Sequence, residues 1–300
     1  MSKLFPTFGK ILKIRFSFKK ILKKLAIIMI ILAALIIVKD EISYQLGDEY
    51  DFYSDDYYEE EFDEDTYCAI EDNIAGLTLN GDLYTYVDTS VEEDSNCYTA
   101  TASEDIVYNI NKVENDPDMK AIILEIDSWG GEPTAAKEVA DALKRAKKPT
   151  VAIIREYGLS AAYWAATGAD IIFANTTSNV GSIGVTMSYL DYSKQNNTEG
   201  ITYQQISAGK FKDSGDPDKQ LTWEEKQLLQ RDVDLLHEMF ISEVAINRDL
   251  EISEVEKLAD GSSMLGQMAL DNGLIDKLGG EYEVIEYLEE LLGEDVGICW

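Results

Sequence analysis

The stretch Ala121-Ile-Ile-Leu-Glu-Ile-Asp-Ser-Trp-Gly-Gly131 decides the fold, because it joins an apolar run directly to a glycine turn. Its first six residues predict a short buried strand. A helix is predicted over 133–147, with Pro133 near its start and Lys and Arg in its last turn. A buried strand that leads through a turn into a helix is typical of the crossover between two parallel strands.

The same alternation continues on both sides of this stretch. Strands are predicted over 74–81, 121–126, 150–154 and 171–174, and the first of them is expected to end in a turn at Asn80-Gly81. A helix is predicted over 160–167, and Ile106, Ile110 and Val113 fall at helical spacing. Strands that alternate with crossover helices predict an α/β protein with a largely parallel sheet.

A long helix is predicted to begin at the capping box formed by Thr222 and Glu225. Its apolar stripe consists of Leu229, Val233, Leu236, Phe240 and Val244. The only histidine of the chain, His237, lies beside this stripe and on no glycine-rich turn. We therefore interpret His237 as a packed or surface residue, and we expect a His237→Ala variant to keep the activity of the protein.

The composition argues against several classes of protein. The chain has 300 residues, with 26 Lys and Arg against 57 Asp and Glu, a formal net charge of -31. Such acidity argues against nucleic-acid binding, which needs a basic face for the phosphates. One histidine and three cysteines exclude zinc sites built on several imidazoles and cysteine-rich metal clusters. A Ser-His-Asp triad would have to use His237.

The charge is unevenly spread, and its distribution predicts a membrane anchor. Residues 1–39 hold nine basic and no acidic residues, and Leu25–Val38 is an unbroken run of fourteen apolar residues. Snorkelling lysines extend this run to a transmembrane segment over 21–38. A buried core helix and a cleaved signal peptide are the alternatives, but no small-residue cleavage site follows Val38. The positive-inside rule then predicts that 1–20 are cytoplasmic and that everything after Val38 is outside.

Residues 39–66 predict an acidic, disordered linker between this anchor and a globular domain over 67–300. Thirteen acidic residues and no basic ones occur between Asp40 and Thr66, and such a run usually stays solvated. Cys68 and Cys97 follow on the outer side, where a disulfide can persist. They could pair with each other, which would leave Cys299 without a partner.

Four glycine-containing turns carry the residues that suggest chemistry. They are Asp127-Ser-Trp-Gly-Gly131, Gly158-Leu-Ser160-Ala-Ala-Tyr-Trp164, Asn179-Val-Gly-Ser182-Ile-Gly-Val185 and Ser207-Ala-Gly-Lys210-Phe-Lys212-Asp-Ser-Gly215. In the first turn, two glycines let backbone N–H groups face a ligand at a helix N-terminus, as an oxyanion hole requires. Taken singly, each turn also has an ordinary explanation: turn chemistry, a helix N-cap at Ser160 or solvated lysines.

Taken together, the four turns resemble the signal peptide peptidase A (protease IV) family, which consists of membrane-anchored serine peptidases with a Ser-Lys dyad. The resemblance covers roughly Asn73 to Gly280 and includes the late turn Ala259-Asp-Gly-Ser262. It implies a crotonase/Clp-protease-like ββα spiral, which would follow the predicted N-terminal transmembrane helix. It also implies a homo-oligomeric ring, in which nucleophile and lysine can come from neighbouring subunits.

Carried over residue by residue, the resemblance implies that Ser160 is the nucleophile and Lys212 the general base. Lys212 is preferred to Lys210 because the family's lysine precedes an acidic or small residue, here Asp213. Ser182 matches the hydroxyl that hydrogen-bonds the lysine amine, and Gly130 with Gly131 match the oxyanion-hole turn. No metal or organic cofactor is implied. A lysine acts as a base near neutral pH only after desolvation lowers its pKa, so we expect Lys212 in a dry, assembled site.

Two departures from the family pattern predict an altered specificity. Trp129 stands where the family usually has proline, and it is expected to fill or line part of the substrate groove. Ala161-Ala162 stand where the family has two glycines, and their methyl groups are expected to crowd the backbone near the substrate carbonyl.

The resemblance implies a membrane-anchored, extracytoplasmic serine endopeptidase of the cell membrane that degrades remnant signal peptides and other apolar peptides through an acyl-enzyme. One alternative is an acyl-CoA enzyme of the same spiral fold, but a site outside the cell is remote from CoA. The other alternative is a catalytically inactive, peptidase-fold scaffold at the membrane.

Overall fold

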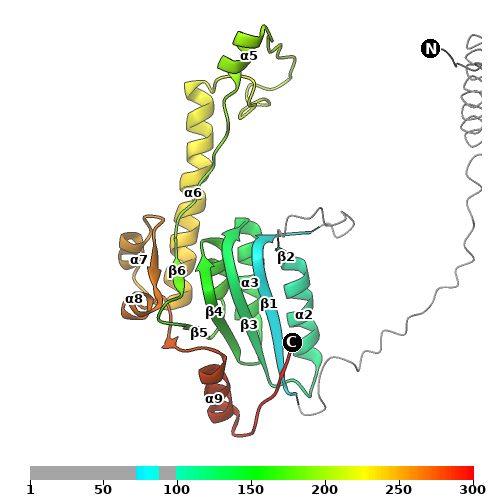
Figure 1. Cartoon of the computed structure of the whole chain (residues 1–300), viewed down its shortest axis with the longest axis vertical. Helices are drawn as coiled ribbons and strands as arrows, with labels where there is room; N and C mark the ends of the chain where they lie inside the picture. Colours follow the sequence, from blue (N-terminus) through cyan, green and yellow to red (C-terminus); the bar gives the residue numbers. More distant parts are fainter. Residues whose placement is uncertain (1–71, 88–98) are drawn as a thin grey trace, which may run out of the picture. The chain divides into compact units, whose positions relative to one another are not determined.

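A nine-stranded sheet forms the centre of the fold in the computed structural model, which describes residues 72–87 and 99–300 (Figure 1). The predicted segments 1–20, 21–38 and 39–66 lie outside the described residues, so the expectations about them stay predictions. Within the described part, no helix combines the length and apolar character that a membrane crossing needs.

The main path of the sheet runs in the order β2-β1-β3-β4-β5-β8. The strands are β1 (Ile74–Tyr84), β2 (Ala100–Ala102), β3 (Ala121–Gly131), β4 (Thr150–Leu159), β5 (Ile171–Ala174), β6 (Asn179–Gly181), β7 (Ser263–Leu265), β8 (Lys277–Leu278) and β9 (Ile298–Cys299). Every strand pair is parallel except β6 with β7. The predicted α/β class with a largely parallel sheet is therefore confirmed.

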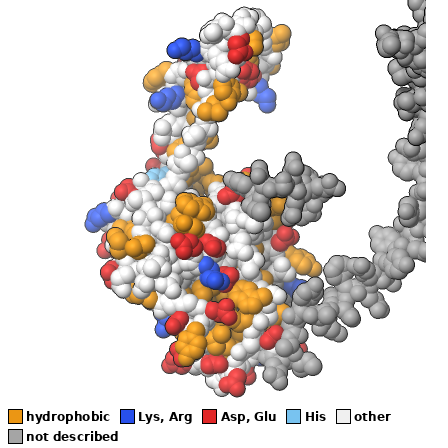
Figure 2. All heavy atoms as spheres, viewed as in Figure 1, with side chains coloured by type: hydrophobic (Ala, Val, Ile, Leu, Met, Phe, Trp, Pro, Cys, Tyr) orange, Lys and Arg blue, Asp and Glu red, His pale blue; other side chains and the backbone are white. Residues whose placement is uncertain are grey.

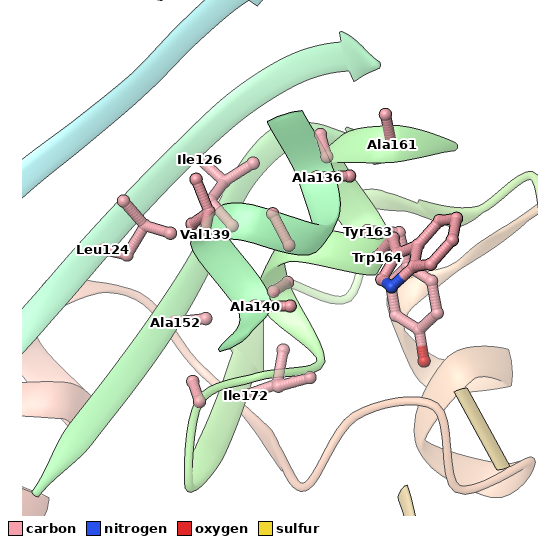
Figure 3. Packing of buried hydrophobic residues seen from close by; sticks show 14 of the residues in the cluster. Leu124, Ile126, Ala136, Val139, Ala140, Ala152, Ala161, Tyr163, Trp164 and Ile172 are labelled. Atoms are coloured by element: carbon pink, nitrogen blue, oxygen red, sulfur yellow. The ribbon is translucent and has the colours of Figure 1, made fainter. Parts of the chain in front are cut away.

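The central strands consist of consecutive apolar residues because helices cover both faces of the sheet. On one face, Leu124, Ile126 and their neighbours pack under α2 (Ser103–Asn115), α3 (Pro133–Arg145) and α4 (Ala161–Ala166). Figure 3 shows this packing for residues of α3 and α4. On the other face, Ile123 and its neighbours pack against α9 (Glu281–Leu292). Successive residues of β3 therefore enter opposite halves of the core. Two short helices, α7 (Ile252–Leu258) and α8 (Gly266–Asp271), complete the domain near β6 and β7.

The expected turn at Asn80-Gly81 is a β-bulge, and the strand continues to Tyr84. The pairing of β1 with β3 shifts register between Asn80 and Asp82, and Gly81 has a positive φ of 70°. A Cβ on Gly81 would lie only 1.8 Å from the carbonyl oxygen of Thr99. Only glycine leaves enough room here for the segment that leads into β2. The need for glycine at position 81 therefore comes from Thr99, which is distant in sequence.

An arm extends from the domain, and we define it as residues 185–236. It contains α5 (Ser193–Glu199) and the first half of α6 (Trp223–Arg248), and α5 lies at the end of α6 that is away from the sheet (Figure 1). The remaining described residues are called the body. The predicted apolar stripe of α6 is more deeply buried in the body than in the arm. Phe240 and Val244 are buried in the body, whereas Leu229 and Val233 are only half-buried.

The C-terminal strand β9 pairs with the first residues of β1, so that Cys299 lies opposite Ala75. Cys299 is disulfide-bonded. The expectation that Cys299 is left without a partner is therefore wrong. The expected pairing of Cys68 with Cys97 falls on residues outside the described ranges.

Candidate active site

Ser160 lies at the sharp turn between β4 and α4. Its φ of 51° and ψ of -124° fall in a region that residues other than glycine rarely adopt. Its N–H donates to the carbonyl of Gly181 (2.8 Å), and its carbonyl accepts from the N–H of Trp164 (3.0 Å). Strained backbone of this kind persists only where the surroundings hold it, and it clusters at functional sites. The turn holds the hydroxyl-bearing residue at the carboxyl end of a buried strand.

The end of β3 passes close beside Ser160, and glycine makes this approach possible. Gly130 has a φ of 124°, and a Cβ there would lie 2.9 Å from the Cβ of Ser160 and 3.2 Å from the amide nitrogen of Ala161. The N–H of Gly130 donates to the buried Ser128 hydroxyl at 3.1 Å. This amide, which the sequence suggested for an oxyanion hole, therefore has an internal partner in this structure.

Two other amides are better placed to meet a ligand beside Ser160. Gly131 lines the cavity next to Ser160, and the neighbouring Glu132 uses its own N–H to bond the Leu83 carbonyl (2.8 Å). Ala161 also lines this cavity and is the first residue of α4, where a helix leaves its amides without an intrahelical acceptor.

Ser182 lies in the same cavity and has a second unusual backbone conformation, with a φ of 52°. Its N–H donates to the Ser262 carbonyl (3.0 Å), and its hydroxyl donates to the Gly261 carbonyl (2.9 Å). The hydroxyl thus uses its proton as a donor, and its oxygen lone pairs remain able to accept a hydrogen bond from an incoming amine. The late turn around Gly261 therefore orients Ser182.

The cavity has a volume of about 500 Å³ and opens onto the surface of the body. Its lining comprises Trp129, Gly131, Pro133, Ser160, Ala161, Trp164, Ser182, Gly184, Val185, Thr186, His237, Phe240, Ala259, Asp260 and Gly261. Three of the predicted site residues, Ser160, Ser182 and Gly131, are thus brought together. In the described ranges, no group of three or more His, Cys, Asp or Glu side chains is arranged to hold a metal ion.

Lys212 does not lie in this cavity. It is exposed in a turn of the arm, where its N–H donates to the Gly209 carbonyl (3.2 Å). The nearby Lys210 forms an ion pair at 2.7 Å with Glu224, in the first turn of α6. The cavity residue His237 comes 13 positions after Glu224, which is about 20 Å along an α-helix. Within a single chain, the predicted base therefore lies far from the predicted nucleophile.

Acidic side chains fix the loop that carries Lys212. The Tyr203 hydroxyl donates to Asp213 (2.9 Å) and to Asp216 (3.3 Å), and the bond to Asp213 is the main cause that raises the pKa of Tyr203 to about 12. Where the loop joins α6, Lys219 pairs with the carboxylate of Glu225, and this bond lowers the pKa of Glu225 to about 2. The loop is therefore ordered without help from the body.

Trp129 lines the entrance of the cavity, as expected from its replacement of the usual proline. Its side chain is 64% exposed, and its ring lies 4.3 Å from that of Tyr157. The Tyr157 ring therefore packs against the tryptophan that borders the cavity.

His237 is a cavity residue that the sequence interpretation missed. It was expected to be an ordinary packed or surface residue, but it lines the cavity that contains Ser160. It precedes Phe240 by three positions and Val244 by seven, so the three side chains share the face of α6 that meets the body. This spacing indicated that His237 faces the body, but not that this face borders the cavity of Ser160.

Comparisons with known proteins show the family of this chain. The model of peptidase family S49 matches residues 142–295, which include Ser160, Ser182 and Lys212. A candidate protease of Methanocaldococcus jannaschii is 36% identical over 63% of this chain and 62% of its own length. A candidate signal peptide peptidase SppA of Enterococcus faecium is 29% identical over 74% of this chain and 64% of its own.

Further similarities are more distant. Protease 4 of Haemophilus influenzae is 24% identical over 80% of this chain and 38% of its own length. A mutant ClpP1 from Listeria monocytogenes aligns over 69% of this chain and 92% of its own, with a TM-score of 0.45 and 13% identity. The matched part of this chain thus spans under two thirds of the length of the M. jannaschii and E. faecium relatives. Because the family model covers half of the sequence, including the Ser160 turn, the chain belongs to peptidase family S49.

Proposed function

We propose that this protein is a membrane-anchored serine peptidase with Ser160 as nucleophile and Lys212 as general base. The observation that carries the proposal is the cavity in which Ser160, in a strained turn, meets Ser182 and Gly131. A nucleophile on such a turn, beside candidate amide donors and a second hydroxyl, is suited to acyl transfer.

The reaction begins when a neutral lysine amine takes the proton of the Ser160 hydroxyl. The serine oxygen attacks the peptide carbonyl, and the carbonyl oxygen becomes an oxyanion. We assign its stabilisation to the amides of Gly131 and Ala161 rather than to Gly130, whose N–H already donates to Ser128. The lysine ammonium returns this proton to the leaving amine as the C–N bond breaks. Water then gives a proton to the neutral lysine and attacks the acyl-enzyme, and the serine oxygen regains the proton as the acid leaves.

The lysine is supplied by a neighbouring subunit in this proposal. Within one chain, Lys212 lies on the arm two residues after Lys210, whose partner Glu224 is about 20 Å along α6 from the cavity residue His237. Burial against a neighbour's cavity would remove water from the amine, which a lysine base requires. The hydroxyl of Ser182 is available there to accept its hydrogen bond.

The surface of the arm supports contact with a second copy of the chain. Large apolar side chains are exposed along it together with charged ones (Figure 2): Met187, Tyr189, Leu190, Tyr192, Ile201, Ile206, Phe211 and Trp223. A monomeric protein rarely leaves so many together in contact with water. Head-to-tail docking of each arm on the next body would close into a ring.

The substrates we propose are remnant signal peptides and other apolar peptides at the outer face of the membrane. The predicted anchor over 21–38 would hold the cavity near the membrane, and one of the relatives is named as a signal peptide peptidase. No metal or organic cofactor takes part in the proposed reaction.

The test is labelling with a fluorophosphonate probe, applied to the full-length protein in mild detergent. The expected result is labelling of wild type at Ser160 and its loss in the Ser160→Ala variant, because only an activated serine reacts rapidly. Ser193→Ala is the matched control, since Ser193 lies on α5 in the arm. An assembled wild-type protein that resists the probe would instead favour the inactive scaffold.

A further inference from the structure

We propose that Asp260 is a positioning residue for the peptidase reaction, because its carboxylate holds the turn that orients the hydroxyl of Ser182. The inference rests on the proposed function, in which that hydroxyl accepts a hydrogen bond from Lys212 of a neighbouring subunit. Asp260 therefore controls where the base is placed, and it takes no proton itself.

Ser182 has a backbone conformation that has to be held by its surroundings. Its φ of 52° lies in the left-handed region, which residues other than glycine seldom adopt. Such a conformation persists only where neighbouring groups fix it. The segment that follows β6 therefore needs a support, and the turn over 259–262 provides it.

Three hydrogen bonds join this turn to Ser182 and to the residue after it. The Ser182 N–H donates to the Ser262 carbonyl (3.0 Å), and the Ser182 hydroxyl donates to the Gly261 carbonyl (2.9 Å). In the opposite direction, the Gly261 N–H donates to the Ile183 carbonyl (3.1 Å). The position of the Gly261 carbonyl thus decides where the Ser182 hydroxyl proton points and where its oxygen lone pairs lie.

The shape of the turn depends on Asp260. One oxygen of its carboxylate, Oδ1, accepts from both the N–H (2.9 Å) and the hydroxyl (2.5 Å) of Ser262. These bonds, first the one from the hydroxyl, lower the pKa of Asp260, so the carboxylate is ionised at neutral pH and both bonds are charge-assisted. They close the turn around Gly261, whose φ of 84° favours glycine. One side chain therefore fixes both carbonyls that Ser182 uses.

Ser160 is held separately from this turn. Its N–H donates to the Gly181 carbonyl (2.8 Å), and β6, which contains Gly181, pairs with β4. Asp260 and Gly261 line the same cavity as Ser160, so the turn borders the space that an incoming lysine has to enter. Loss of the Asp260 carboxylate should therefore misplace the acceptor for the lysine and leave the nucleophile in place.

The experiment is a double-mutant cycle on the full-length protein in mild detergent, with cleavage of a fluorogenic apolar peptide as the readout. We expect Asp260→Ala to lower kcat about tenfold with KM unchanged, because a misplaced base slows only the chemical step. Asp260→Asn should stay within about twofold of wild type, because its amide oxygen accepts the same two bonds. In a Ser182→Ala background, Asp260→Ala should cause no further loss, because the hydroxyl through which Asp260 acts is absent.

Two further variants make the result specific. Asp116→Ala removes a similar bond elsewhere in the body, in which Asp116 Oδ1 accepts from the Asp118 N–H (2.9 Å), and it should leave kcat unchanged. Ser262→Ala keeps the carbonyl that Ser182 uses and loses the hydroxyl bond to Asp260, so it should lower kcat about threefold. If Asp260→Ala does not assemble, Ser262→Ala takes its place in the cycle, and a wild-type kcat in that variant would contradict the inference.

Four outcomes of the cycle would overturn the inference. Asp260→Ala with wild-type kcat is one, and an equal loss of kcat in the presence and absence of the Ser182 hydroxyl is another. A rise in KM would mean that Asp260 binds substrate, and an equal loss in Asp260→Asn would mean that its charge matters rather than its bonds. In all four cases, a wild type that the fluorophosphonate probe labels at Ser160 leaves the peptidase function standing. A wild type that is neither labelled nor able to cleave the peptide would overturn both proposals.

Discussion

The body buries the side chains that hold Ser160, whereas the arm leaves many of its apolar side chains exposed around Lys212. In the body, residues such as Tyr163 and Ala162 are fully buried directly after the nucleophile. In the arm, Ile206 is 97% exposed, and ordering comes from local polar bonds such as Tyr203 to Asp213. The difference supports the proposal that the body positions Ser160 by itself, whereas the arm brings Lys212 into a site only through contact with a second chain.

The strongest test of this comparison separates the two halves of the dyad. Ser160→Ala in the body and Lys212→Ala in the arm should each lower kcat/KM by at least about a thousandfold, because each removes a reacting group. Co-assembled, the two variants should regain about a quarter of wild-type activity if each site joins neighbouring subunits at random around a ring.

The control for this experiment is Lys210→Ala, which removes a neighbouring lysine paired with Glu224 and should keep activity. If mixed assemblies form but remain inactive, this would contradict the proposal that Lys212 of one subunit acts in the site of its neighbour. Full activity of an isolated monomer would contradict it equally.

A second test compares two positions on the same helix. Phe240→Ala should destabilise the protein by about 3–5 kcal/mol, because it removes a side chain that is 1% exposed and stacked on Trp164. Leu229→Ala, on the same stripe but half-buried in the arm, should cost about 1 kcal/mol. Melting temperatures of the detergent-solubilised chain should fall by about 10 °C and about 3 °C, respectively. Similar losses at both positions would show that the arm is packed as tightly as the body.

The smallest expected effect is a pH dependence at the base of the arm. The pKa of Glu225 is lowered from 4.5 to about 2, first by its bond to Lys219 and then by the Thr222 amide. Because the folded-state pKa lies below the unfolded value, the ionised carboxylate stabilises the fold above about pH 4.5 and loses this effect as the pH falls to about 2.

Glu225→Gln should therefore melt at a lower temperature than wild type at neutral pH. The gap between the two should narrow as the pH is lowered from about 4.5 towards 2. A gap that is independent of pH would mean that packing or hydrogen bonding, rather than charge, makes Glu225 important.

Local signals in the sequence predicted the framework of this fold correctly. The apolar run 121–126 predicted the buried strand, and Pro133 predicted the start of α3. The capping box of Thr222 and Glu225 is present with both of its reciprocal bonds. Each of these features depends on interactions between residues within a few positions of one another, so it can be recognised from the sequence alone.

The features that the sequence did not predict depend on distant contacts. The bulge at Gly81 lies beside Thr99, and Cys299 lies opposite Ala75 because β9 returns to β1. His237 joins the cavity because α6 packs its second half on α4, which the periodicity of one helix cannot reveal. Ser160 and Ser182, which the resemblance assigned to one site, line the same cavity, and the roles of Ser160, Ser182 and Lys212 stay predictions.

The distance between the Lys212 loop and the cavity has a consequence for the synthesis of this protein. If the dyad forms only between chains, a newly made copy is inert while it is alone, and it needs no inhibitory propeptide to protect its surroundings. Its rate of peptide cleavage would then rise more steeply than its abundance, since dilution in the membrane separates the two halves of every site. In this proposal, the arm makes the rate of catalysis depend on the local concentration of the protein in the membrane, because a single chain has no complete site.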